Sequence, residues 1–362
     1  MKNISRFLIL LVVFTLTLAG CAGPEDASST QESPAQSGDT SQGQTEPVKL
    51  ILGAYTTPRE AYQELIPLFQ KQWKEKTGQE VVFEESYLGS GAQSRAIVEG
   101  FEADIAALSL AADIDRIEKA GLITHNWESG PYKGMVSNSI VSFAVRPGNP
   151  KGIQDWDDLA QPGVEILTPN VKTSGGAMWN ILALYGAARR GFVEGVAKDD
   201  ETAAQDFLLK VLNNVTVMDK GARESITNFE KGVGDLAITY ENEVLVGQKA
   251  GQTYELVIPR STIQIENPVA VIDTYVDKHG NRAVAEAFVE FLLSKEAQEI
   301  FAKYGLRSVD PEVAKATSSQ YPPVEDQFSI EYFGGWDKAT PEFFGDEGIY
   351  NQVISQAQSA NK

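Results

Sequence analysis

Short segments of glycine and hydroxyl residues stand where predicted strands give way to predicted helices. The clearest is Ser174-Gly175-Gly176-Ala177, which follows the apolar run Val164–Leu167 and opens an amphipathic segment. A strand that turns through glycine into a helix points bare backbone N–H groups at one place, and such groups bind oxyanions without a positive side chain. This segment therefore predicts an anion-binding loop.

Three other segments have the same pattern. They are Gly89-Ser90-Gly91, Gly221-Ala222-Arg223 and the helix start at Tyr55-Thr56-Thr57-Pro58, where Thr57 is the expected N-cap. Glycine lets a ligand approach the amide closely, and hydroxyl groups add donors that carry no charge. Because the carboxyl ends of parallel strands lie at one edge of a sheet, we expect the four segments to surround one ligand.

These segments are embedded in an alternation of strands and helices that starts at Val48. Apolar runs at 48–52, 81–83, 104–108, 164–167, 215–218 and 236–240 predict strands, and helical apolar spacing follows most of them. Alternation over this length favours two doubly wound α/β lobes over a single barrel. Extended runs at 139–145 and 268–275 are the expected crossings between the lobes.

The expected domain division follows from these crossings. Residues 48–138 with about 268–319 form one discontinuous lobe, residues 139–267 form the other, and the ligand lies in the cleft between them. The segment 320–362 is not assigned to either lobe.

The amino-terminal residues have the composition of a targeting segment. Lys2 and Arg6 precede an apolar run from Phe7 to Leu18 that is short for a membrane span, so residues 1–20 are predicted to be a signal peptide. Leu18-Ala19-Gly20-Cys21 resembles the lipobox of bacterial lipoproteins, which implies cleavage before Cys21 and a diacylglycerol on its thiol. Residues 21–47 then form a lipidated cysteine and a disordered tether, rich in Ser, Gln, Pro and Gly.

The charge and cysteine content exclude several classes of protein. The formal net charge of −19 argues against nucleic-acid binding and against membrane binding through a basic surface patch. It does not exclude an anion site, because long-range fields are screened over roughly 8–10 Å at physiological salt while loop dipoles act at contact distance. Cys21 is the only cysteine, which rules out an intramolecular disulfide framework and a cysteine-based zinc cluster. We expect no metal and no cofactor.

From Val48 to the 333–336 region, the chain resembles the bacterial periplasmic sulfate-binding proteins of ABC importers. The segments that carry the resemblance are Gly89-Ser90-Gly91, Glu102-Ala103-Asp104, Thr168-Pro169-Asn170, Thr173-Ser174-Gly175-Gly176-Ala177, Gly221-Ala222-Arg223, Tyr240-Glu241-Asn242-Glu243 and Phe333-Gly334-Gly335-Trp336. The resemblance implies a type II periplasmic-binding-protein-like fold. It also implies a monomer that is anchored outside the cytoplasm and docks on an ABC permease in the membrane.

The resemblance further implies that a dehydrated sulfate is held by neutral donors alone. These donors are the backbone amides of Thr56, Ser90, Gly175, Gly176 and Ala222 and the hydroxyl of Ser174. Tyr240 stands where the family has a tryptophan whose indole N–H donates, and Thr56 stands where the family tends to have an aspartate. Asp104 and Arg223 match charged residues behind the ligand, and we expect them to orient the loops without touching it.

Donor counting predicts the selectivity of such a site. Sulfate only accepts hydrogen bonds, whereas phosphate carries protons that need acceptors, and an unmatched buried polar group costs roughly 1–3 kcal/mol. The Tyr240 oxygen is the exception, because a phenol lone pair can accept a phosphate proton. Thiosulfate and other tetrahedral dianions are harder to exclude.

Other functions stay open at this point. An enzyme is not expected, because the chain shows no nucleophile elbow, Walker motif or zinc spacing and His125 and His279 are its only histidines. Glu241 and Glu243 form an acid pair in sequence, but surface or loop-orienting roles fit an acidic protein better. The remaining alternatives are an adhesive surface lipoprotein without a ligand, and a binder of thiosulfate, molybdate, phosphate or ferric ion.

Overall fold

The structure is a computed structural model that describes residues 46–360, and strands alternate with helices from its start. Leu50, Leu52 and Ala54 of the first strand are fully buried, and Tyr62, Leu65 and Phe69 line the buried face of the helix that follows. The three strands of this part run parallel in the order β2-β1-β3. Its elements are β1 (Val48–Tyr55), α1 (Arg59–Thr77), β2 (Val81–Leu88), α2 (Ser90–Val98), β3 (Ile105–Ala107) and α3 (Ala111–Lys119).

A second parallel group repeats this arrangement further along the chain. Its strands lie in the order β7-β5-β6. The elements are β5 (Ile166–Pro169), α4 (Gly175–Arg189), α5 (Glu201–Asn213), β6 (Val215–Asp219), α6 (Ala222–Glu230), β7 (Leu236–Tyr240), α7 (Glu241–Lys249) and β8 (Glu255–Val257).

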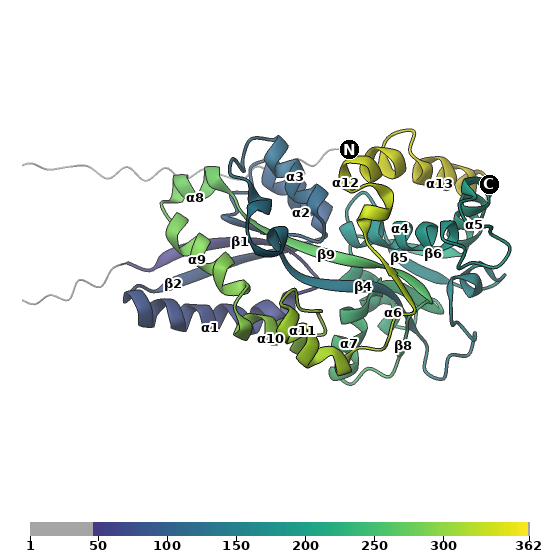
Figure 1. The fold of residues 1–362 in the computed structure, drawn as a ribbon, viewed down its shortest axis with the longest axis horizontal. Coiled ribbons are helices and arrows are strands. Elements are labelled where there is room, and N and C mark those ends of the chain that lie inside the picture. The colour runs from purple at the N-terminus through teal and green to yellow at the C-terminus, as the bar shows by residue number, and fades with distance from the viewer. Residues whose placement is uncertain (1–45, 361–362) are drawn as a thin grey trace, which may run out of the picture. The chain divides into compact units, whose positions relative to one another are not determined.

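Two long antiparallel strands connect the groups, as Figure 1 shows for β4 (Met135–Val145) and β9 (Ser261–Val271). β9 pairs with β3 and β4 pairs with β7, so one sheet has the order β2-β1-β3-β9-β4-β7-β5-β6. β8 adds to β4, and β10 (Asp326–Phe328) adds to β9. The predicted run 268–275 misses both ends of the strand. β9 begins at Ser261, before the predicted run, and the run is too long at its other end, because α8 (Asp273–His279) begins where the Asp273 carboxylate accepts the backbone N–H groups of Thr124 and His125.

Helices of the late chain cover the first group. α9 (Arg282–Leu292) and α10 (Lys295–Lys303) contact α1 and share its apolar core, and α11 (Pro311–Thr317) follows them. Single-turn helical segments occur at Trp127–Ser129, Pro131–Gly134, Trp156–Ala160, Ser318–Gln320, Ile330–Phe333 and Thr340–Phe344.

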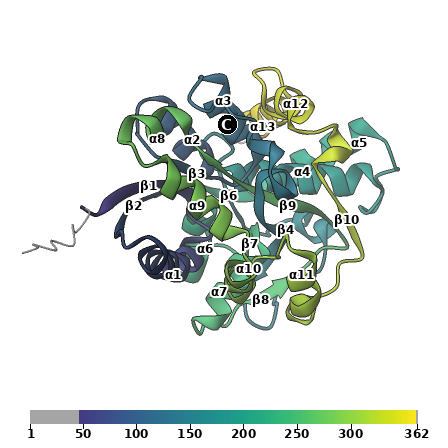
Figure 2. The same cartoon turned by 60° about the vertical axis from the view of Figure 1, so that its left-hand side comes forward.

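The segment after residue 320, which the sequence leaves unassigned, packs on the second group. α13 (Ile349–Ala360) packs on α5, and α12 (Trp336–Ala339) lies beside α4 and also contacts α3 of the first group (Figure 2). The Trp336 ring meets Trp179 edge-on at 4.7 Å between centroids, and Phe343 meets Tyr185 at 5.0 Å. This cover explains why α4 is apolar on nearly all sides.

The predicted fold class is confirmed. Two α/β groups with parallel strands are joined by antiparallel crossing strands, and each has its own apolar core. The lobe boundaries stay a prediction, since the described residues belong to one compact unit. Within residues 46–360, no helix combines the length and the apolar character that crossing a membrane requires.

Candidate anion-binding site

The predicted anion loops meet around one small cavity at the carboxyl ends of the strands. Its volume of about 10 Å³ suits a guest of a few atoms. No lining residue carries a charge. The lining consists of Tyr55, Thr56, Thr57, Gly89, Ser90, Ser109, Ser174, Gly176, Ala222 and Tyr240.

Six of the seven predicted binding residues are among these ten, and Gly175 lies next to them. α2, α4 and α6 begin at Ser90, Gly175 and Ala222, so three of the five expected amide donors are first residues of helices. The first N–H groups of a helix have no carbonyl partner within it, and the helix dipole adds partial positive charge there. The converging helix starts therefore favour an anion without a cationic side chain.

The fourth segment differs in detail from its prediction. α1 begins at Arg59 with Pro58 in the N-cap position, and Thr57 does not cap the helix. Thr57 is buried in the cavity wall instead. Thr56 still precedes a helix start beside the cavity, which is where the resemblance requires its amide.

Glycines are required here because the loops approach one another closely. A Cβ atom on Gly176 would lie 2.7 Å from Cε2 of Tyr240, and one on Gly175 would lie 2.7 Å from Oγ of Ser109. A Cβ on Gly89 would lie 2.5 Å from the carbonyl oxygen of Thr173. Side chains at Gly89 and Gly175 would push apart segments that come from the two strand groups, and a side chain at Gly176 would displace the Tyr240 ring.

The two predicted serines use their hydroxyls differently. Ser174 caps α4 by accepting the N–H of Ala177 at 3.4 Å, which leaves its hydroxyl hydrogen to donate. Ser90 donates to Oδ2 of Asp113 at 2.6 Å and accepts the N–H of Ser109 at 3.0 Å. The hydroxyl of Ser90 is thereby engaged, and its backbone amide is the group left for a ligand.

Ser109 and Tyr55 also belong to the wall, although neither was among the predicted binding residues. Oγ of Ser109 lies 2.6 Å from the hydroxyl oxygen of Tyr240, and the Tyr55 ring lies 6.2 Å from the Tyr240 ring between centroids. Burial raises the pKa of both tyrosines, so both hydroxyls keep their protons. The missed signal is position, because Tyr55 ends β1 and Ser109 follows β3 at the same sheet edge.

Comparisons with known proteins decide the family. A model of bacterial extracellular solute-binding proteins matches residues 50–307. The sulfate-binding protein of Synechococcus elongatus is 44% identical over 346 residues, which cover 95% of this chain and 94% of that protein. The chain belongs to this family of bacterial solute-binding proteins.

Two further relatives agree with this assignment. The sulfate-binding protein of Escherichia coli is 41% identical over 316 residues, 84% of this chain and 93% of that protein. Among solved structures, the sulfate-binding protein SubI from Mycobacterium tuberculosis superposes with a TM-score of 0.75 at 36% identity and covers 82% of this chain and 99% of that chain.

In this solute-binding protein, Arg223 lies behind the cavity and joins several elements. Its guanidinium binds both carboxylate oxygens of Glu60 and reaches Oε2 of Glu243 at 2.7 Å. Burial opposes the charge of Arg223, but the carboxylates of Glu243 and Glu60 outweigh burial and raise its pKa. The charge of Arg223 is thus directed at protein carboxylates and not into the cavity.

Asp104 does not have the position that the resemblance implies. It precedes β3 at the amino end of that strand, where it accepts the N–H of Ile51 at 2.7 Å and contacts Nδ1 of His279 at 2.7 Å. The cavity lies at the carboxyl ends of the strands, so β3 separates Asp104 from Ser109. The expectation that Asp104 orients the binding loops is therefore wrong.

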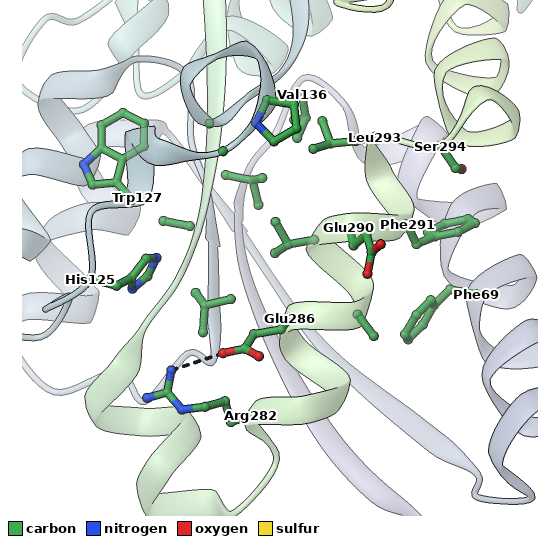
Figure 3. A pocket seen from close by; sticks show the side chains of 18 of the residues that line it. Phe69, His125, Trp127, Val136, Arg282, Glu286, Glu290, Phe291, Leu293 and Ser294 are labelled. Atoms are coloured by element: carbon green, nitrogen blue, oxygen red, sulfur yellow. Dashed lines mark hydrogen bonds and ion pairs between the residues drawn. The ribbon is translucent and has the colours of Figure 1, made fainter.

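A larger groove of about 930 Å³ elsewhere in the solute-binding protein contains none of the predicted binding residues (Figure 3). Its wall is largely apolar and includes Phe69, Trp127 and Phe291. Arg282 in this groove pairs with Glu286 at 3.4 Å. The predicted lipid site, Cys21, lies outside the described residues.

Proposed function

We propose that this protein captures sulfate in the small cavity and delivers it to an ABC importer. The observation that carries the proposal is the composition of the wall: its ten residues are neutral, several carry hydroxyls, and they include the first residues of α2 and α6 and the residues on either side of the first residue of α4. The sulfate-binding relatives support the choice of ligand. The donors are the amides of Thr56, Ser90, Gly175, Gly176 and Ala222 and the hydroxyls of Ser174 and Tyr240.

The energetics of this donor set suit a dianion. A hydrogen bond to a charged acceptor contributes about 1.5–3 kcal/mol. About seven such bonds offset the loss of hydration that otherwise prevents burial of a small dianion. A cationic side chain is not needed, and its absence from the wall lets the site select by donor geometry.

Other tetrahedral oxyanions are the alternative ligands. Thiosulfate and molybdate offer acceptors in a similar arrangement, so size and acceptor strength must separate them from sulfate. Ferric ion fits less well. Tyr55 and Tyr240 lie close to each other, but burial raises the pKa of both and they keep their protons, and no carboxylate lines the cavity. The proposed role is binding without chemical conversion.

Capture requires movement of the two strand groups. We assign residues 48–138 with about 268–319 to one lobe and residues 139–267 to the other. We place the hinge between the lobes in the crossing strands β4 and β9. Ala92 donates its N–H to the carbonyl of Thr173 at 3.0 Å across these groups, beside two of the glycine loops. Ligand contacts from both sides would favour the closed arrangement over an open one.

The proposed location is outside the cytoplasm, with a lipid on Cys21 anchoring a monomer. The reason is the lipobox-like sequence at Leu18–Cys21 followed by a polar tether. Labelling of bacteria with a radioactive fatty acid tests this assignment. The wild-type chain should incorporate label and Cys21→Ser should not, and equal labelling of both would refute the anchor.

The function itself is tested by calorimetric titration of the purified protein. We expect one sulfate per chain with micromolar or tighter affinity, and weaker binding of phosphate. The absence of a sulfate signal, together with no rise in melting temperature with any small oxyanion, would favour an adhesive protein instead. Parallel titrations with thiosulfate and molybdate rank the alternative ligands.

A further inference from the structure

Two buried hydroxyls share one hydrogen bond on the cavity wall. Oγ of Ser109 and the hydroxyl oxygen of Tyr240 are 2.6 Å apart, and either of them can be the donor. Both residues line the cavity and are about 1% exposed. Two hydroxyls carry two protons, and their mutual bond uses one, so one proton remains for another partner.

The rest of Ser109 is fixed by the protein. Its N–H donates to Oγ of Ser90 at 3.0 Å, and its carbonyl accepts from Nε1 of Trp179 at 2.9 Å and from Nδ2 of Asn267 at 3.1 Å. Gly175 packs closely against its side chain. Within this frame, rotation of the two hydroxyl hydrogens changes the polarity of the wall without moving any heavy atom.

The two hydrogen positions present different faces to a guest. In the first, Ser109 donates to Tyr240, and Tyr240 donates to an oxygen of the guest. In the second, Tyr240 donates to Ser109 and accepts a proton of the guest with a lone pair, while the Ser109 hydrogen faces another guest oxygen. An indole N–H at the Tyr240 position allows only the first of these, because it has no lone pair to offer.

We propose that Ser109 and Tyr240 form a reversible donor and acceptor pair, through which the site takes singly protonated tetrahedral oxyanions such as hydrogenphosphate as well as sulfate. This inference rests on the proposed function of the cavity. Burial keeps the proton on Tyr240, so the pair has the two protons that the scheme requires. Ser109 is the specificity-determining residue, because it supplies the acceptor for the Tyr240 proton when Tyr240 accepts from the guest.

The test is competition calorimetry at a pH where inorganic phosphate is a singly protonated dianion, so that it matches sulfate in charge. The wild-type protein should bind sulfate, and hydrogenphosphate should displace it with a higher Kd. In Ser109→Ala, the ratio of the hydrogenphosphate Kd to the sulfate Kd should rise about tenfold or more, since the Tyr240 proton then lacks an acceptor. Tyr240→Trp should raise the same ratio while it keeps one donor for sulfate.

The outcomes separate this inference from the proposed function. If sulfate binds the wild type and hydrogenphosphate does not displace it, the pair does not act as an acceptor. If Ser109→Ala and Tyr240→Trp change both Kd values by the same factor, the two residues have only a structural role. If neither anion binds the wild type, the proposed function itself fails. Melting of each variant without ligand checks the fold, and the tryptophan variant decides the question if the alanine variant does not fold.

Discussion

Arg223 of α6 and Glu60 of α1 form an ion pair that joins the two strand groups beside the cavity. Nη2 of Arg223 lies 2.9 Å from Oε2 of Glu60, and the same nitrogen reaches the carbonyl of Thr57 at 3.3 Å. Glu60 follows the β1 loop that contains Thr56, and Arg223 follows Ala222. Each partner is thus close in sequence to an expected sulfate donor of its own strand group.

Loss of this pair should weaken sulfate binding without removing a donor. We expect Glu60→Gln to raise the sulfate Kd roughly three- to tenfold, because a half-buried charged pair contributes on the order of 1 kcal/mol to the closed arrangement. Titration calorimetry measures the change. The matched control is Glu64→Gln, since Glu64 is on the same helix but pairs with Lys303 within one group. An equal effect of both variants would show that closure does not depend on Arg223.

A single methyl group at Gly176 should damage the site. In Gly176→Ala the new Cβ lies 2.7 Å from the Tyr240 ring, so the ring or the start of α4 must move, and we expect at least a tenfold loss of sulfate affinity. Gly130→Ala is the control, because a Cβ there has no atom within 4 Å and the backbone is extended. Calorimetry and thermal melting distinguish lost binding from lost folding. Unchanged affinity in the Gly176 variant would contradict the position of the site.

Sulfate binding should depend little on ionic strength. Because no charged side chain lines the cavity, an increase of sodium chloride from about 0.05 to 0.5 M should change the sulfate Kd by less than about threefold. Chloride is the suitable salt, since it does not imitate a tetrahedral ion. A steep loss of affinity with salt would show that a cationic group contacts the anion.

The contact between His279 and Asp104 should make stability depend on pH. Burial opposes protonation of His279, but the carboxylates of Asp104 and Glu102 outweigh it and raise the pKa of His279 above its ordinary value of 6.5. The stabilisation that protonated His279 gives the folded protein is therefore complete below the ordinary pKa of 6.5. It is lost as the pH rises through the higher pKa that His279 has in the folded protein. We expect His279→Gln to lower the melting temperature by about 2 °C or more near pH 5.5 and by less near pH 9.

Sulfate binding by the His279 variant is the control for this pH effect. Because the pair is at the amino ends of the strands, His279→Gln should leave one sulfate bound per chain at both pH values. A larger loss of stability at the alkaline pH would reverse the sign and refute the assigned protonation.

The sequence alone determined the local parts of this protein. Helix starts at Ser90, Gly175 and Ala222 follow from glycine turns after apolar strands, because the bare N–H groups and the capping chemistry belong to neighbouring residues. The crossing β4 was predictable from its apolar run. The bounds of β9 were not: the strand begins at Ser261, before the predicted run, and it ends before α8, which begins where Asp273 meets amides about 150 residues away in sequence.

Only the tertiary structure decided which side chains face the cavity. Ser109 contacts Tyr240 across 131 residues of sequence, and the resemblance placed Asp104 behind the ligand although it lies at the other end of its strand. A strand rises about 3.3 Å per residue, so its two ends lie far apart. Sequence spacing does not say which of these ends a distant loop will meet. Pairing between distant strands fixes that choice, and it therefore fixes the site.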